Sequence, residues 1–153
     1  MDFNYNFTTI QETAQIRNLI DFIALQDLGY PGYGQWVEKT EHELNMGVKG
    51  AILAYSEGKL AADLIFQTHK RIPRVVEIKN LRTHPDLRRK YFARFMLKQL
   101  ESESTGYNVL LVDARESQTD MVHFLQSSGF APILSTNLYS PNERDLIMAK
   151  PLT

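Results

Sequence analysis

The sequence predicts a single α/β (α+β) domain with a mixed, mostly antiparallel central sheet and helices on both faces. Two observations predict this class. First, 153 residues are enough for one domain with a sizeable core and too few for two ordinary domains. Second, a half rich in hairpin signals precedes a strand–helix–strand unit, so the sheet should combine both strand orientations. We therefore expect one domain over residues 1–153, in the order β-α-α-β-β-β-α-β-α-β-β.

Periodicity and turn residues define the elements of the first half. Aromatic and polar residues alternate from Phe3 to Thr9, which is typical of a half-buried strand. Thr9 and Glu12 have the spacing of a capping box, and an apolar stripe follows them. The predicted elements are a strand over 3–9, a helix from there to about 27, a helix over about 36–46, and strands over 51–55 and 60–67 joined by a hairpin turn at 56–59.

The stretch over residues 75–103 organises the chain. Val75–Thr83 predicts a strand, and Pro85 and Asp86 mark a turn. Apolar residues then recur at helical spacing, at Leu87, Tyr91, Phe92, Phe95, Met96 and Leu100. A strand that leads directly into a helix presents unpaired N–H groups at the positive end of the helix dipole, and phosphates bind such junctions.

The second half continues with alternating strands and helices. A strand is expected over 107–114, and its continuous apolar core predicts burial on both faces. A short helix around residues 121–128 should end at Gly129. Two final strands are expected over 130–134 and 145–150, and residues 135–144 between them are expected to form a loop because they contain Asn137, Pro141 and Asn142.

Charge is distributed unevenly although the net charge is only −1. Ten lysines and arginines lie between Lys70 and Lys98, against only Glu77 and Asp86, while the remainder of the chain is strongly acidic. A basic centre in acidic surroundings favours a compact polyanionic ligand over a long nucleic acid, which the flanks would repel. The alternative is a solvated basic face without a ligand.

Other patterns exclude several function classes. The chain has no cysteine, which excludes disulfides, a thiolate nucleophile and cysteine metal sites. The histidines show no metal-ligand spacing, so no metal is expected. Neither a signal peptide nor an apolar run of membrane-spanning length is present, and we expect a cytoplasmic protein without a membrane partner.

The segment Arg88-Arg89-Lys90-Tyr91-Phe92-Ala93, preceded by Pro85, resembles the signature Gln/Arg-x-x-Gly-x-Gly/Ala of the GNAT family of N-acyltransferases, whose element order also matches essentially the whole chain. Arg88 and Ala93 match the signature, whereas Tyr91 stands at its glycine and Arg89 at a second common glycine. The resemblance implies acetyl-coenzyme A (acetyl-CoA) as co-substrate. Its pyrophosphate would lie on the N–H groups of this turn, and its pantetheine arm would lie along the preceding strand end, where the strand splays from its neighbour. The implied cofactor-binding residues are Leu81, Arg82, Thr83, Arg88, Arg89, Lys90, Tyr91, Phe92, Ala93, Arg94 and Gln118.

Glu77 is the predicted general base. A central strand covered on both faces should be apolar, and burial raises the pKa of a carboxyl group towards the range that suits proton abstraction. Glu77 also precedes Arg88 by eleven residues, which resembles the histone-acetyltransferase branch of the family. The alternative is an ion pair with Lys79 or Arg71.

The family's general acid, a tyrosine, is replaced here by Leu125, which cannot donate a proton. The thiolate would then leave unassisted, as its modest basicity allows, or would be protonated by water or by another residue. Tyr107, His123 and Tyr139 are candidates for that donor.

The resemblance implies an N-acetyltransferase in which an amine attacks acetyl-CoA directly, with Glu77 as base. The acceptor would be a small-molecule or peptide amine, selected by the loops around 30–36 and 135–144, and Tyr30, Tyr33 and Trp36 lie where the family's acceptor groove is walled. A homodimer is one expected state, because the family often dimerises. The alternative is a catalytically weak or inactive module that binds coenzyme A or a partner protein.

Overall fold

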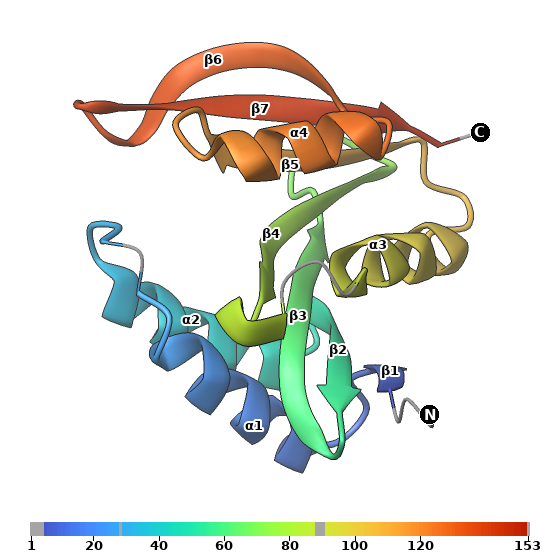
Figure 1. Cartoon of the computed structure of the whole chain (residues 1–153). Coiled ribbons are helices and arrows are strands. Elements are labelled where there is room, and N and C mark those ends of the chain that lie inside the picture. Colours follow the sequence, from blue (N-terminus) through green and yellow to red (C-terminus); the bar gives the residue numbers. More distant parts are fainter. Residues whose placement is uncertain (1–4, 28, 88–90, 153) are drawn as a thin grey trace.

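The computed structural model describes residues 5–27, 29–87 and 91–152 (Figure 1). A seven-stranded sheet with the order β1-β2-β3-β4-β5-β7-β6 forms the centre. Neighbouring strands are antiparallel except β4 and β5, which are parallel. The elements are β1 (Tyr5–Thr9), α1 (Thr13–Ala24), α2 (Tyr33–Asn45), β2 (Lys49–Ser56), β3 (Lys59–Thr68), β4 (Val75–Thr83), the 3-10 helix η1 (Pro85–Leu87), α3 (Phe92–Glu103), β5 (Val109–Arg115), α4 (Thr119–Ser127), β6 (Ala131–Ser140) and β7 (Glu143–Pro151). The predicted fold class and element order are confirmed.

Helices cover the sheet unevenly on its two faces. The apolar sides of α1 and α2 pack on β2 and β3, in a core that includes Leu19, Ile23, Leu53 and Ile65. On the other face, α3 and α4 pack across the sheet in a second core that includes Phe92, Met96, Leu110, Leu125 and Met148. Burial of these side chains is the main stabilising term, at roughly 1.5–3 kcal/mol for each large one. Figure 1 shows α1 and α2 next to β2 and β3 rather than β5 and β7, so one face of β5 and β7 is left without a covering helix.

The central parallel strands separate part-way along their length. Pairing between them covers only Val75–Ile78 of β4 against residues 109–112 of β5. On the other side of β4, Ile65 faces Asn80 while Phe66 faces Ile78, so the residue between them is extra. Such a β-bulge bends its strand, and the divergence of β4 from β5 begins at the same residue, Lys79. The splay expected near the end of this strand is therefore present.

Three predicted boundaries near the N-terminus are wrong in detail. The capping box of α1 is formed by Glu12 and Gln15 rather than by Thr9 and Glu12. Thr9 ends β1, and its hydroxyl donates to Glu103 over 2.7 Å. The helix ends at Ala24 rather than near residue 27, and α2 already begins after Gly32, whose left-handed backbone (φ 69°) forms its N-cap.

The helix expected from Leu87 onward begins later. Leu87 ends a 3-10 turn, and α3 starts at Phe92 after Tyr91, which has a left-handed φ of 65°. Apolar spacing is shared by the turn and the helix, so periodicity alone could not separate them. Residues 88–90 lie outside the described part of the chain.

The loop expected over residues 135–144 is instead a continuation of both strands. β6 runs to Ser140, β7 begins at Glu143, and only a tight turn separates them. The side-chain amide of Asn137 donates to the carbonyl oxygens of Ser140, Pro141 and Glu143 at 2.8–3.3 Å. The turn-forming residues therefore stabilise the tip of a hairpin rather than interrupt its strands.

Candidate active site

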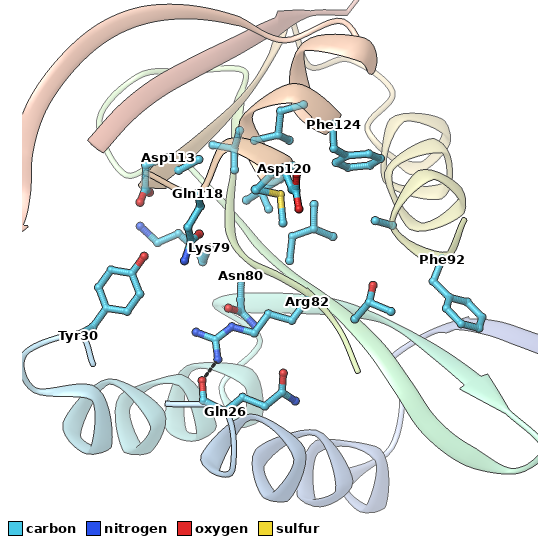
Figure 2. A pocket seen from close by; sticks show the side chains of 18 of the residues that line it. Gln26, Tyr30, Lys79, Asn80, Arg82, Phe92, Asp113, Gln118, Asp120 and Phe124 are labelled. Carbon is cyan, nitrogen blue, oxygen red and sulfur yellow. Dashed lines mark hydrogen bonds between the residues drawn. The ribbon is translucent and has the colours of Figure 1, made fainter. Parts of the chain in front are cut away.

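A cleft of about 1330 Å³ opens where β4 and β5 diverge (Figure 2). Its walls come from β4, β5, the first turn of α3, helix α4, the segment joining α1 to α2 with the first turn of α2, and β6. The splay removes strand pairing at this point, so the backbone edge of β4 faces the cleft instead of a neighbouring strand. Residues that are far apart in the sequence thus meet around one space.

Most of the predicted cofactor residues line this cleft. They are Leu81, Arg82, Thr83, Tyr91, Phe92, Ala93, Arg94 and Gln118. Arg88, Arg89 and Lys90 lie outside the described residues, and their contacts with a cofactor stay a prediction. The cleft therefore brings the end of β4, the start of α3 and the start of α4 together.

Tyr91 takes the conformation that a glycine adopts easily. Its φ is 65°, and it is the N-cap residue of α3. Left-handed backbone costs a residue with a Cβ atom about 1–2 kcal/mol, which glycine avoids. The ring is 66% exposed, so it extends into solvent at the rim instead of filling the space in front of the helix. The first turn of α3 carries no side-chain cap among the described residues, which leaves it suited to an anion.

Arg82 contacts the cleft with its backbone but turns its side chain towards α1 and α2. The guanidinium donates to the main-chain carbonyl of Gln26 and, over 3.1 Å, to the hydroxyl of Tyr33 (Figure 2). It also lies 5.4 Å from the centre of the Tyr33 ring. Arg82 therefore ties the start of the α1–α2 connection to β4.

Asp63 lies on β3 directly opposite Arg82 and is fully buried. Burial raises the pKa of this carboxyl to about 7, although the hydrogen bond from Asn80 (2.8 Å) and the nearby Arg82 oppose the shift. Its second oxygen has no hydrogen-bond partner among the described residues. A carboxylate in this position is costly when ionised, so the proton state of Asp63 near neutral pH matters for stability.

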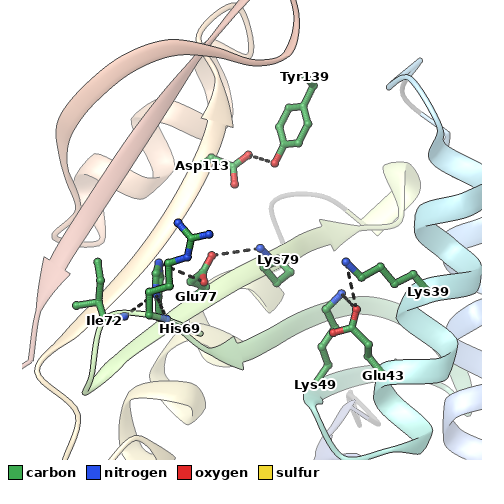
Figure 3. Close-up of polar contacts among 10 residues, drawn as sticks. Lys39, Glu43, Lys49, His69, Ile72, Glu77, Lys79, Asp113 and Tyr139 are labelled. Carbon is green, nitrogen blue, oxygen red and sulfur yellow. Dashed lines mark hydrogen bonds and ion pairs between the residues drawn. The ribbon is translucent and has the colours of Figure 1, made fainter.

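Glu77 does not line the cleft. It faces an adjoining cavity of about 410 Å³, and its side chain is 22% exposed. One carboxylate oxygen lies 3.2 Å from Lys79, and the other lies 3.6 Å from the Nε2 atom of His69 (Figure 3). The dry surroundings expected of this strand are absent here, while the ion pair with Lys79 that was the alternative is present. The role of Glu77 as base stays a prediction.

Asp113 lines both cavities and was missed at the sequence level. It follows Val112, the last residue of β5 that pairs with β4. The Tyr139 hydroxyl donates to its Oδ2 atom over 2.9 Å. Burial raises the pKa of Asp113, and the bond from Tyr139 and the charge of Lys79 oppose this shift. A carboxyl group directly after the continuous apolar run of β5 was the available signal. The sequence could not show that the splay of β4 opens the cleft beside Asp113.

Aromatic and cationic side chains frame Asp113 from two distant segments. Tyr30, between α1 and α2, packs edge-on against Tyr139 of β6 with their ring centres 5.3 Å apart. The guanidinium of Arg115 lies 4.0 Å from the centre of the Tyr30 ring. The Nε atom of Arg115 also lies 3.3 Å from the carboxylate of Glu143. The β6–β7 hairpin and the α1–α2 connection thus meet beside the carboxylate.

Structural comparison identifies the architecture. An acetyltransferase from Escherichia coli that acts on the alanine of ribosomal protein S18 superposes with a TM-score of 0.79, covering 97% of this chain and 94% of that one at 23% identity. The chain has the GNAT fold. A Desulfovibrio desulfuricans protein described as a GNAT-family acetyltransferase gives a TM-score of 0.84 at 11% identity, with 97% and 99% coverage.

A third similar structure contains a ligand. A Salmonella typhimurium protein described as an acetyltransferase, solved with its cofactor acetyl-CoA, gives a TM-score of 0.76 at 12% identity, covering 100% of this chain and 95% of the other. No protein-family model and no curated protein sequence matches the chain. At these identities the likeness establishes the fold, and the chemistry depends on the residues of this chain.

Leu125 stands where the GNAT family has its tyrosine general acid, so a proton donor would have to come from elsewhere. Leu125 is fully buried in the core beneath the cleft. Tyr107, one of the three alternative proton donors, shares a hydrogen bond of 3.0 Å with Thr68 and lines neither cavity. His123 is exposed and also lines neither. Of the three alternatives, Tyr139 is the one at the cleft.

The described residues contain no group of three or more His, Asp or Glu side chains arranged to hold a metal ion. None of the helices described here is both long and apolar enough to cross a bilayer.

Asp63→Asn should change how stability depends on pH. Folding raises the pKa of Asp63 from 3.8 to about 7, so the folded protein binds more protons than the unfolded chain between these values. The free energy of unfolding therefore falls as pH rises through this window, by up to about 1.4 kcal/mol per pH unit. Urea unfolding at pH 5 and pH 8 should show the advantage of Asp63→Asn over the parent growing with pH. The exposed Asp21→Asn is the control, and a pH-independent difference would contradict the assignment.

Tyr91→Gly should stabilise the protein by about 1 kcal/mol, because it relieves the left-handed backbone and removes little packing. Tyr91→Ala keeps the Cβ atom and should give no such gain. Chemical unfolding of both variants separates the backbone effect from the loss of the ring. Equal stabilities for the two would show that the ring, not the backbone, determines the outcome.

Proposed function

We propose that the protein is an acetyl-CoA-dependent N-acetyltransferase that transfers the acetyl group to an amine. One observation carries this proposal: the β4–β5 cleft joins the start of α3, which no side chain of the described residues caps, to a partly buried carboxylate, Asp113. The first feature suits the phosphates of the coenzyme, and the second suits an amine that must lose a proton. The similar structures described as acetyltransferases support the same reaction class.

The coenzyme would bind along the predicted residues. The exposed backbone edge at Leu81, Arg82 and Thr83 offers hydrogen bonds to the amide groups of the pantetheine arm. The start of α3 offers its N–H groups to the pyrophosphate, where Arg88, Arg89, Lys90 and Arg94 would add positive charge. Gln118, at the start of α4, offers an amide to the same cleft.

The transfer step needs one proton acceptor. The amine nitrogen attacks the thioester carbonyl carbon, a C–N bond forms, and the C–S bond breaks with its electron pair on sulfur. The amine proton passes to a carboxylate, and the thiolate takes a proton from solvent. Glu77 is the acceptor predicted from the sequence, directly or through a water molecule. The position of Asp113 on the wall of the cleft favours Asp113 as a second candidate.

The acceptor is a small-molecule or peptide amine. Among the similar structures, one acts on a ribosomal protein alanine, and another is a chimera of a spermidine N-acetyltransferase. Tyr30, Tyr33 and Trp36 line the cleft, which supports the proposal that they form a wall of the acceptor groove. The alternative function is a module that binds coenzyme A without turnover, which Tyr91 and Leu125 favour because both depart from the family's pattern.

Calorimetry with acetyl-CoA and a thiol-release assay with a panel of amines test this function. Binding together with amine-dependent thiol release is the expected result. Binding without release from any amine would favour the inactive module, and no binding would reject both. Tight binding of coenzyme A alone does not decide between them.

Removing each carboxylate identifies the base. If Asp113 accepts the proton, Asp113→Asn should lower kcat by roughly 10²–10⁴, the usual share of general-base catalysis, and Glu77→Gln should lower it far less. If Glu77 is the base, the order is reversed. Acetyl-CoA affinity measured by calorimetry should stay near that of the parent in both variants. Parent turnover in both would assign proton removal to water or to another group.

A further inference from the structure

The cavity next to the cleft is lined by residues that the proposed transfer step does not use. It shares Trp36, Lys79, Asp113 and Tyr139 with the cleft, so the two spaces adjoin beside Asp113. Figure 3 shows Asp113 with Tyr139 and, across from them, Lys79 and Glu77. A molecule whose amine lies at Asp113 can therefore extend its remaining part into the second cavity. The charge of that cavity then bears on which amines bind.

Positive charge predominates in the lining of this cavity. Three carboxylates face it, from Glu43, Glu77 and Asp113. Five cationic side chains face it, from Lys39, Lys49, Lys70, Arg71 and Lys79. Low-dielectric walls strengthen the field of such a set on a bound ligand.

Two of the three carboxylates are already paired with some of these cations, and the third, Asp113, accepts the hydrogen bond from Tyr139. Glu43 lies 3.7 Å from both Lys39 and Lys49, and Glu77 lies 3.2 Å from Lys79. Lys70 and Arg71 have no ion-pair partner among the described residues. Both are exposed at the rim of the cavity, so their charges are available to a ligand.

The loop that carries these two residues is held in place. The Nδ1 atom of His69 accepts hydrogen bonds from the backbone N–H groups of Arg71 (3.0 Å) and Ile72 (2.9 Å). The other ring nitrogen lies 3.6 Å from Glu77 (Figure 3). A fixed backbone lowers the ordering cost of binding, because only the side chains of Lys70 and Arg71 then have to be ordered by a ligand.

We infer that the acceptor carries an anionic group, a carboxylate or a phosphate, that binds Lys70 and Arg71 while its amine lies at Asp113. The inference rests on the proposed function, whose acceptor it specifies. Arginine binds both groups through paired hydrogen bonds. A polycationic acceptor such as a polyamine meets like charge in the same place and binds more weakly.

Peptides of one length with an N-terminal alanine test this inference. The residues after the alanine are glutamate, phosphoserine, glutamine or arginine, and the glutamate and glutamine peptides are nearly identical in shape, so this pair differs mainly in charge. At low salt the glutamate or phosphoserine peptide should have a KM about tenfold below that of the glutamine peptide, and the difference should shrink as salt is raised. The better of the two anionic peptides identifies the preferred group. Equal KM values for anionic and neutral peptides would overturn the inference.

Reversing the charge of Lys70 and Arg71 tests whether these two residues cause the preference for anionic peptides. The double variant Lys70→Glu/Arg71→Glu should lose the preference for anionic peptides, so the ratio of KM for the glutamine peptide to KM for the glutamate peptide should fall from about ten to one or below. Lys59→Glu, an exposed reversal on β3 outside both cavities, is the matched control and should keep the preference. A preference that survives in the double variant would contradict the assignment to these residues.

A binding measurement keeps this inference separate from the proposed function. Fluorescence anisotropy of labelled glutamate and glutamine peptides needs no turnover. Tighter binding of the glutamate peptide to the parent, but not to the double variant, supports the inference even if no amine is acetylated. Equal binding of both peptides overturns it even if acetyl transfer occurs.

Discussion

The divergence of β4 from β5 is the constraint on which the rest of the structure depends. Two parallel strands that paired along their whole length would close the centre of the sheet. The extra residue at Lys79 bends β4 where its pairing to β5 ends. The opening exposes the backbone edge of β4 and the side chain of Asp113 to the cleft. In the proposed reaction the coenzyme binds the first of these and the amine binds at the second.

Around this opening, the two faces of the sheet are covered to different extents by helices. Helices α3 and α4 close the face that contains the larger core, and the first residues of α3 line the cleft. Helices α1 and α2 cover only part of the opposite face, which leaves room for charged side chains on β4 and β5. Incomplete coverage explains how Glu77, Lys79 and Asp113 can remain polar in the middle of a sheet without the full cost of burial.

The order of elements could be predicted because it depends on local patterns, such as the apolar stripe of α1 and the continuous apolar run of β5. The start of α3 could not, because the left-handed turn at Tyr91 leaves no mark in periodicity. The strand character of residues 135–140 was hidden by Asn137, whose side chain caps a hairpin. Among site residues, those near the signature were found by resemblance. Tyr139 was named only as a candidate proton donor, and Asp113 was missed, because the hydrogen bond between them joins segments 26 residues apart.

Arg82 belongs to both halves of the site. Its backbone lies on the wall where the coenzyme is proposed to bind, and its guanidinium holds the carbonyl of Gln26 at the start of the α1–α2 connection. A main-chain carbonyl can be held in this way whatever side chain residue 26 carries. The α1–α2 connection can therefore change its sequence during evolution without losing this anchor. If it selects the acceptor, as proposed, new acceptor preferences can arise there while the proposed coenzyme site stays unchanged.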